Sequence, residues 1–238
     1  MFAILKKEFN SFFASPIAYL VMGVFLLING LFLWVFKHDF NILNAGFADL
    51  NPFFFLAPWV FLFLIPAITM KSFADEFNNG TIELLKTKPI SDWQIVLGKF
   101  WASLLLVIIT LIPTLTYVYT IHQLGNPIGN LDYGSTIGSY IGLLFLAATY
   151  TAIGLFTSTI SKNQIVAFIL GVFITFLLFY GFDAIAKSLD SNITLQKMGI
   201  NAHYKSISRG VIDTRDLIYF ISVTGFFLFI TKTRLENV

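Results

Sequence analysis

The chain has 238 residues, of which 57% are hydrophobic and only 12% are charged. An average soluble domain contains roughly 25% charged residues, so this composition excludes an ordinary water-soluble enzyme. The formal net charge is +2, from 15 basic and 13 acidic side chains, which is too balanced to predict binding to nucleic acid. The sequence contains no cysteine, which excludes a disulfide framework and a thiolate metal site.

The first predicted element is a helix over residues 1–14. Its large apolar side chains recur at steps of three and four residues, while Lys6 and Lys7 lie on the opposite face. This pattern favours an amphipathic helix in the membrane interface, in contact with lipids. The alternative is that the segment simply continues the first membrane span. The apolar face consists of Phe2, Leu5, Phe9 and Phe12.

Six apolar runs follow along the chain. A helix needs about 20 residues to cross roughly 30 Å of hydrocarbon. The last run is short, so we expect it either to extend into Arg215 and Asp216 or to cross a thin part of the bilayer. The sequence predicts an all-α polytopic membrane protein with six transmembrane helices in one domain over residues 1–238. The spans are expected at about 17–36, 52–70, 100–121, 135–160, 163–182 and 217–231.

The distribution of Lys and Arg predicts the orientation of these spans. The N-terminal segment, the loop over 71–99 and the C-terminal tail are rich in basic residues, whereas the other short loops contain almost none. The positive-inside rule therefore places both termini in the cytoplasm. The loop over 183–216 carries five basic residues, which weakens the bias, but its length and its acidic residues favour an extracytoplasmic position.

The loop over 71–99 is the only sizeable polar segment predicted on the cytoplasmic side. Gly80 follows two asparagines and predicts a break, after which Thr81 is expected to cap a short helix that ends before Pro89. Ser91 and Gln94 form a capping box that predicts the start of the next helix. The short helix carries Glu83, Leu84 and Leu85. Such a helix suits insertion into a groove on another protein, and the alternative is a solvated loop without a partner.

We find no pattern of residues that predicts catalysis. The carboxylates Asp75, Glu76 and Glu83 have no histidine nearby in the sequence, so we expect solvated charges and no metal site. Protease and hydrolase motifs are absent. The pair Gly98 and Lys99 lacks the upstream glycine and the following hydroxyl residue of a P-loop. We therefore expect a non-catalytic chain that binds neither ATP nor a cofactor.

Two features lie within the predicted spans. Gly134, Gly138 and Gly142 repeat every four residues, which allows a neighbouring helix to approach closely. Packing within the chain is the favoured interpretation, and dimerisation is the alternative. Asp183 closes the fifth span, where an ionisable group indicates a functional site unless it lies just beyond the hydrocarbon.

The loop over 70–100 resembles the permease subunits of ABC-2 type exporters. The resemblance rests on Phe73, Glu76, Gly80, Thr81, Glu83, Leu84, Pro89, Ile90, Gly98 and Lys99, and on His203-Tyr204 followed by Ser208 to Asp213. Within that family the sequence is similar to the gliding-motility permease subunits of flavobacteria. That similarity is carried by SFFASPIAYL, GFADLNPFFFLAPWVFLFLIP and LGNPIGNLDYGSTIGSYIGLLFLAATYTAIG.

The resemblance implies a permease in the bacterial inner membrane that couples ATP hydrolysis to transport or export in gliding motility. An ABC ATPase subunit would bind the ATP and Mg²⁺, a companion membrane subunit would carry a periplasmic domain, and permease subunits would pair. The resemblance also implies an N-terminal interfacial helix and a coupling helix for the ATPase. The ATPase-coupling residues would be Glu76, Gly80, Thr81, Glu83, Leu84, Leu85 and Pro89. The alternative function is a membrane anchor or force-transmitting scaffold that moves no solute.

Overall fold

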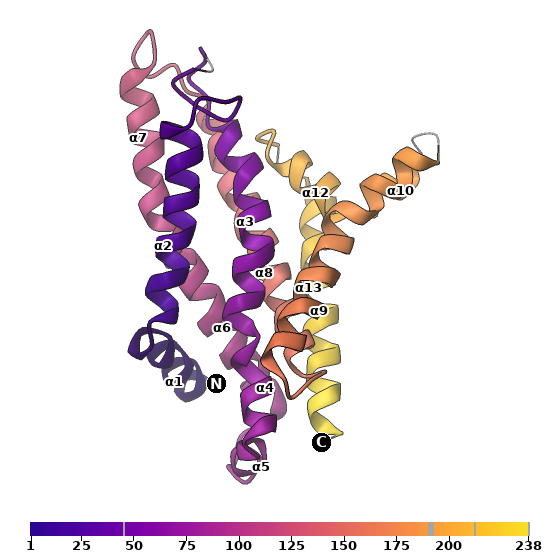
Figure 1. The fold of residues 1–238 in the computed structure, drawn as a ribbon. Coiled ribbons are helices and arrows are strands. Elements are labelled where there is room, and N and C mark those ends of the chain that lie inside the picture. Colours follow the sequence, from indigo (N-terminus) through magenta and orange to yellow (C-terminus); the bar gives the residue numbers. More distant parts are fainter. Residues whose placement is uncertain (45, 190–192, 212, 238) are drawn as a thin grey trace.

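The computed structural model describes residues 1–44, 46–189, 193–211 and 213–237. These residues form helices and no strand, and six helical segments are long and apolar enough to cross a membrane, which confirms the predicted fold class. The segments are Ile17–Val35, Asn51–Asn78, Asp92–Leu124, Tyr133–Ile160, Gln164–Ser188 and Thr214–Glu236. Figure 1 shows them as an elongated bundle, with both termini near the end that carries the short helix α5 (Thr81–Lys86).

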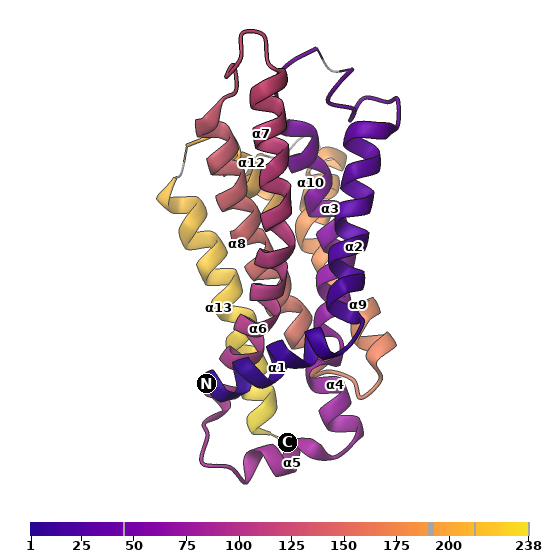
Figure 2. The same cartoon turned by 90° about the vertical axis from the view of Figure 1, so that its left-hand side faces the viewer.

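The N-terminal segment is a separate helix. Helix α1 (Phe2–Ala14) ends at Ser15, whose backbone is extended with φ −107° and ψ 159°. Helix α2 (Ile17–Gly30) then begins after Pro16 and ends in a π-helical turn over Leu31–Val35. Figure 2 shows α1 lying across the lower end of the bundle, at a steep angle to α2. The alternative in which this segment continues the first span is therefore wrong.

The second and third spans are joined by the polar loop. Helix α3 (Asn51–Thr69) passes into α4 (Lys71–Asn78) through Met70, which keeps right-handed helical angles of φ −54° and ψ −32°. After α5, helix α6 (Asp92–Leu111) begins at the predicted cap, where the hydroxyl of Ser91 accepts a hydrogen bond from the Gln94 N–H at 3.4 Å. The helix–break–helix order predicted for this loop is confirmed.

The third span is interrupted at Pro113. This proline has no N–H to donate, and the helix tightens there into a 3₁₀ turn over Ile112–Thr114 before it continues as α7 (Leu115–Leu124). Helix α8 (Tyr133–Ser158) follows, and Asp132 caps it by accepting a hydrogen bond from the Ser135 N–H at 3.0 Å.

The last two spans are longer than the apolar runs that predicted them. Helix α9 (Gln164–Phe176) continues through a π-helical turn over Leu177–Gly181 into α10 (Phe182–Ser188), so the helix extends past residue 182. Helix α13 (Thr214–Glu236) includes the charged residues on both sides of its apolar run and has 23 residues.

The segment predicted as a loop over 183–216 contains helical structure. The end of α10, the short α11 (Ile193–Gln196) and α12 (Ile200–Ile207) all lie within it. Residues 190–192 of this predicted loop lie outside the described residues, as does Ile212, which also belongs to the family resemblance.

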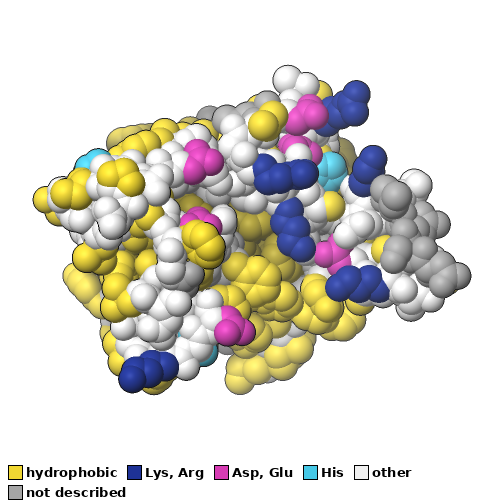
Figure 3. Space-filling view, turned by 90° about the horizontal axis from the view of Figure 1, so that it is seen from above, with side chains coloured by type: hydrophobic (Ala, Val, Ile, Leu, Met, Phe, Trp, Pro, Cys, Tyr) yellow, Lys and Arg dark blue, Asp and Glu magenta, His cyan; other side chains and the backbone are white. Residues whose placement is uncertain are grey.

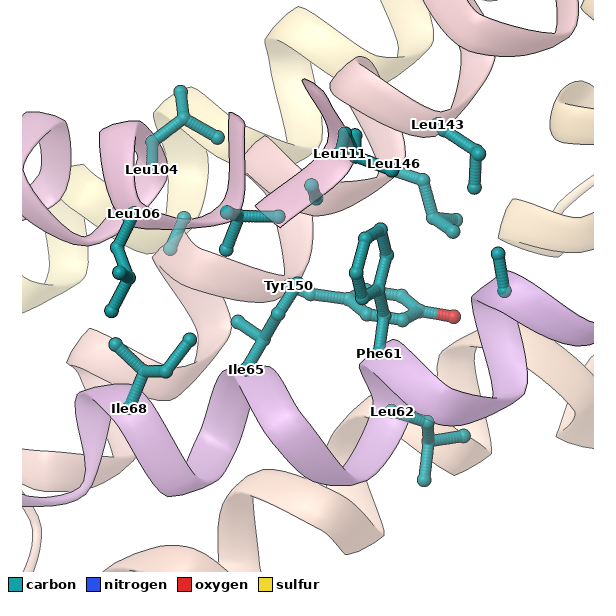
Figure 4. Packing of buried hydrophobic residues seen from close by; sticks show 14 of the residues in the cluster. Phe61, Leu62, Ile65, Ile68, Leu104, Leu106, Leu111, Leu143, Leu146 and Tyr150 are labelled. Atoms are coloured by element: carbon teal, nitrogen blue, oxygen red, sulfur yellow. The ribbon is translucent and has the colours of Figure 1, made fainter. Parts of the chain in front are cut away.

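Helix α8 lies at the centre of the bundle and contacts α3, α6, α9, α12 and α13. Figure 4 shows the core that it forms with α3 and α6, in which Tyr150 of α8 lies beside Phe61 and Ile65 of α3. In contrast, α2, α9 and α13 expose apolar side chains along much of their length. An exposed apolar surface of this kind is what lipid or a second subunit covers in a membrane protein.

Glycines allow α12 and the turn after it to approach α8. A Cβ atom at Gly138 would lie 2.8 Å from the Ile207 carbonyl oxygen, and one at Gly142 would lie 3.3 Å from the Tyr204 ring. At Gly210, which has φ +86°, an added Cβ would lie 3.0 Å from the carbonyl carbon of Gly134. Gly134, Gly138 and Gly142, the three glycines singled out in the sequence, therefore all face a contact within this chain.

Candidate functional site

The loop that carries the family resemblance forms the end of the bundle near both termini. Gly80 adopts a left-handed conformation with φ +67° and occupies the N-cap position of α5. The sequence predicted Thr81 as the cap, but the chain must turn sharply after α4, and glycine adopts this conformation without steric cost. Thr81 becomes the first residue of the helix instead, and its hydroxyl lies 3.5 Å from the Glu76 carbonyl oxygen.

Helix α5 is fixed on one face and exposed on the other. Ile82 is buried, and the Lys86 ammonium donates a hydrogen bond to the Leu235 carbonyl oxygen at 2.5 Å, which ties α5 to the end of α13. Glu83 is exposed, and Leu84 is 66% exposed. Leu85 is half-buried and Pro89 is exposed. The helix therefore presents an acidic and an apolar side chain outward from a fixed position.

A groove of about 500 Å³ lies beside α5. Its walls come from the start of α6 with the residues just before it and from the end of α13, which are distant in the sequence and close in Figure 2. Trp93 is 37% exposed in this groove. The lining residues are Lys86, Ile90, Ser91, Asp92, Trp93, Lys232 and Glu236. This groove could not be predicted from the sequence, because no local pattern joins residues 86–93 to residues 232–236.

A buried ion cluster joins α1, α4 and α6 behind this surface. Lys99 is 2% exposed, and its ammonium lies 3.0 Å from Glu8 Oε1 and 2.9 Å from Glu76 Oε1. It also donates a hydrogen bond to the Ser72 carbonyl oxygen at 2.7 Å and lies 5.1 Å from the centre of the Phe73 ring. These partners compensate the charge of a lysine that has lost its water.

A second lysine completes the charge balance of the cluster. The Lys7 ammonium lies 3.4 Å from Glu8 Oε1 and 3.6 Å from Glu76 Oε1. Partial burial lowers the pKa of Lys7, but the two carboxylates raise it more, so its pKa is above the ordinary value of 10.5. Two cations and two anions therefore meet at this junction. Glu76 faces this cluster, unlike Glu83, which faces outward.

Helix α1 rests directly on the start of α6. A Cβ atom at Gly98 would lie 2.9 Å from the Ile4 side chain and 3.2 Å from the Met1 carbonyl oxygen. Ile4 is the buried residue of α1, whereas Phe2 is 74% exposed. Leu5, Phe9 and Phe12 are half-buried. The apolar face predicted from the sequence therefore left out Ile4 and Glu8, which lie four residues apart on the side that contacts α4 and α6.

The α8–α9 turn is joined to the same end of the bundle. The Gln164 amide, at the start of α9, donates a hydrogen bond to the Asp75 carboxylate on α4. Asp75, Glu8 and Glu76 are thus all engaged by neighbouring helices. Of the acidic side chains that the sequence singled out in this loop, Glu83 is the one that faces outward.

Six spans and a structured polar loop, with an outward-facing short helix beside both termini, define a polytopic membrane protein. The chain matches the model of the ABC-2 family transporter proteins over residues 2–211 and belongs to this family. It is therefore a permease subunit of an ABC transporter, and membership implies pairing with an ABC ATPase subunit. No curated protein matches the chain significantly.

Proposed function

We propose that this permease subunit couples ATP hydrolysis by a separate ABC ATPase to transport across the bacterial inner membrane, with α5 as the coupling helix. The observation that carries the proposal is the exposure of Glu83 and Leu84 on a helix that Ile82 and Lys86 hold in place. A docking helix needs outward-facing anchor residues and a fixed base. In this proposal both termini are cytoplasmic, and ATP and Mg²⁺ bind to the partner.

The contacts behind α5 connect it to three other helices, through which a displacement of α5 by the ATPase would spread. Helix α5 follows α4 directly, and Glu76 of α4 holds Lys99 of α6 and lies beside Lys7 of α1. A displacement of α5 would therefore reach the second span through α4, and the third span and the N-terminal helix through the ion cluster. Close packing favours transmission because packed interfaces shift between discrete arrangements and do not deform continuously.

A finer assignment rests on sequence similarity. The segments shared with gliding-motility permeases lie in α1 and α2, in α3, and in the stretch from α7 to α8. We propose a role in gliding motility, together with a companion membrane subunit that has a periplasmic domain. Pairing with a second permease subunit would cover part of the apolar surface that α2, α9 and α13 leave exposed.

The coupling proposal is tested by Leu84→Lys combined with Glu83→Ala. We expect this variant to lower the affinity for the ATPase subunit, measured by co-purification, about thirtyfold, because truncation of a docking anchor typically costs about 2 kcal/mol. ATP turnover stimulated by the permease should fall with it. Ile128→Lys is the matched control, since Ile128 is 69% exposed in the connection between α7 and α8. Figure 1 shows this connection at the end of the bundle opposite α5. Unchanged binding and turnover in the double variant would refute the coupling role of α5.

Reconstituted vesicles that contain the complete complex separate transport from anchoring. ATP-dependent displacement of a lipid, an ion or a polypeptide would support a transporter. A complex that assembles and hydrolyses ATP without displacing any of them would support the force-transmitting scaffold instead.

A further inference from the structure

A cavity opens at the end of the bundle opposite α5. It has a volume of about 440 Å³ and lies between α3, α10 and α12. Figure 3 looks onto this end and shows a hollow with hydrophobic side chains on its floor and Lys and Arg side chains along one side. The coupling surface at the other end of the molecule does not use this cavity.

Asp183 is a buried carboxylate in the wall of this cavity. It is 5% exposed, and its Oδ2 accepts a hydrogen bond from the Asn201 amide at 2.5 Å. Its other oxygen, Oδ1, has no protein donor within the described part of the chain. A buried carboxylate oxygen is strongly disfavoured without a donor. Asp183 therefore favours a ligand that brings a hydrogen-bond donor, and a cationic donor most of all.

Six of the thirteen residues that line the cavity are aromatic. The Trp59 ring lies against Phe179 and Tyr180, with ring centroids 5.5 and 5.7 Å apart. Phe54, Phe55 and Tyr204 complete the aromatic lining. The Tyr204 hydroxyl already donates to the Phe54 carbonyl oxygen at 2.7 Å. Aromatic faces beside a carboxylate are suited to an ammonium group, because the ring quadrupole attracts a cation.

The mouth of the cavity favours an anion, in contrast to the interior, which favours a cation. Lys187 of α10 and Lys205 of α12 both line it and are exposed. Two ammonium groups at the entrance favour an anionic group there, and a phosphate is the anion that such a pair commonly binds. The cavity therefore favours a cation inside and an anion outside.

The cavity is also continuous with the surface that faces lipid. Phe55 lines it and is 53% exposed. The centroids of the Trp59 and Phe176 rings lie 6.4 Å apart. Phe176 and Phe173 belong to the exposed apolar face of α9. An apolar chain attached to a ligand in the cavity could therefore lie along α9, outside the protein core.

We infer that this cavity binds the zwitterionic headgroup of an aminophospholipid, with the amine against Asp183, the phosphate at Lys187 and Lys205, and the acyl chains along α9. A purely anionic lipid would bring no cationic donor to Asp183, and its negative charge would be repelled by the carboxylate. A purely cationic amphiphile would leave both lysines without an anion. This site is independent of the proposed function, because it would bind lipid whether or not α5 couples to an ATPase.

The test uses the full chain in mild detergent and short-chain lipids, with binding measured by native mass spectrometry. Dioctanoyl phosphatidylethanolamine should bind about tenfold more tightly than dioctanoyl phosphatidylglycerol, because only the former offers an amine to Asp183. This comparison needs no variant and so does not depend on folding. Equal binding of the two lipids would overturn the inference.

Variants locate the binding. Asp183→Asn should remove the preference for the amine, and Lys187→Gln with Lys205→Gln should weaken binding of both lipids severalfold. The matched controls are Asp39→Asn and Lys197→Gln, which change exposed residues outside the cavity and should bind as the unchanged chain does. If Asp183→Asn kept the full preference for the amine, Asp183 would not be the partner of the ligand.

A final comparison identifies the source of the headgroup. Glycerophosphoethanolamine has the same ammonium and phosphodiester groups without acyl chains, so we expect it to bind far more weakly than the lipid. Binding as tight as that of the lipid would show a site for a soluble zwitterion and would refute the assignment to a membrane lipid. Failure of the Leu84 test leaves all of these expectations unchanged, so the two proposals fail separately.

Discussion

Lys99 places a positive charge in the interior of a membrane protein, at the junction of three helices. A lone buried ammonium is costly, and two carboxylates and one carbonyl oxygen offset that cost here. The family pattern drew attention to Glu76 and Lys99, but nothing in the sequence pointed to Glu8. Residues 8, 76 and 99 are far apart in the chain, and only the meeting of α1, α4 and α6 in the folded protein brings them together.

We expect Lys99→Met to destabilise the protein by roughly 3 kcal/mol, because it leaves two largely buried carboxylates with only the exposed Lys7 as a counter-charge. Thermal or chemical unfolding in detergent would measure the loss. Adding Glu8→Gln and Glu76→Gln to the variant should recover part of it, since neutral amides need no counter-charge. A loss below about 1 kcal/mol would show that the cluster is solvated.

Lys7→Met is the matched control for this prediction. The Lys7 side chain is 62% exposed, so its removal should cost no more than about 1 kcal/mol. The two carboxylates raise the pKa of Lys7 on folding. The contribution of Lys7 to the free energy of unfolding is therefore present below pH 10.5 and is lost as the pH rises through the pKa of the folded state. Both variants remove a lysine that contacts Glu8 and Glu76, so the difference between them reports the effect of burial.

At the scale of elements, the long helices were predictable and the short ones were not. An apolar run of about 20 residues has few alternatives to a membrane span, so all six were found. Helices α11 and α12 have only four and eight residues, and their positions depend on contacts that local sequence does not encode. Tyr204 holds α12 to α3 through the Phe54 carbonyl oxygen, 150 residues away.

The contact between α8 and α12 yields a prediction for Gly138→Ala. The added methyl group would meet the Ile207 carbonyl oxygen at 2.8 Å and the Gly210 Cα at 2.9 Å. Both atoms belong to the backbone and cannot rotate away, so we expect a loss of about 1–3 kcal/mol in unfolding free energy.

Gly225→Ala provides the comparison for this prediction. Nothing lies within 4 Å of the position that its Cβ atom would occupy on α13. Alanine is the better helix former by about 1 kcal/mol, so this variant should be neutral or stabilising. Equal effects of the two substitutions in thermal unfolding would argue against close packing of α12 on α8.

At the scale of the whole molecule, six spans place both termini and α5 at one end of the bundle. The side of the membrane on which this end lies follows from the distribution of Lys and Arg and stays a prediction. The cavity between α3, α10 and α12 and the groove beside α5 could not be predicted, because each is lined by segments that are distant in the sequence.

The orientation is testable by single-cysteine labelling, because the chain contains no cysteine of its own. Thr87→Cys lies just after α5, and Asp39→Cys lies in the loop at the opposite end, and both positions are exposed. In intact cells whose outer membrane has been permeabilised, a membrane-impermeant maleimide should label position 39. It should reach position 87 only after the inner membrane is opened. The reverse order would invert the topology.

The segment Asn51–Asn78 has a consequence of its own. Its 28 residues are interrupted only at Met70. They form one nearly continuous helix about 42 Å long. Trp59 stands in the cavity wall near one end, and Glu76 in the ion cluster lies about 25 Å away near the other. If α5 moves this long helix, the cavity changes shape with it. Thermodynamic reciprocity then requires a ligand that prefers one cavity shape to change, by the same factor, the affinity with which α5 holds its partner.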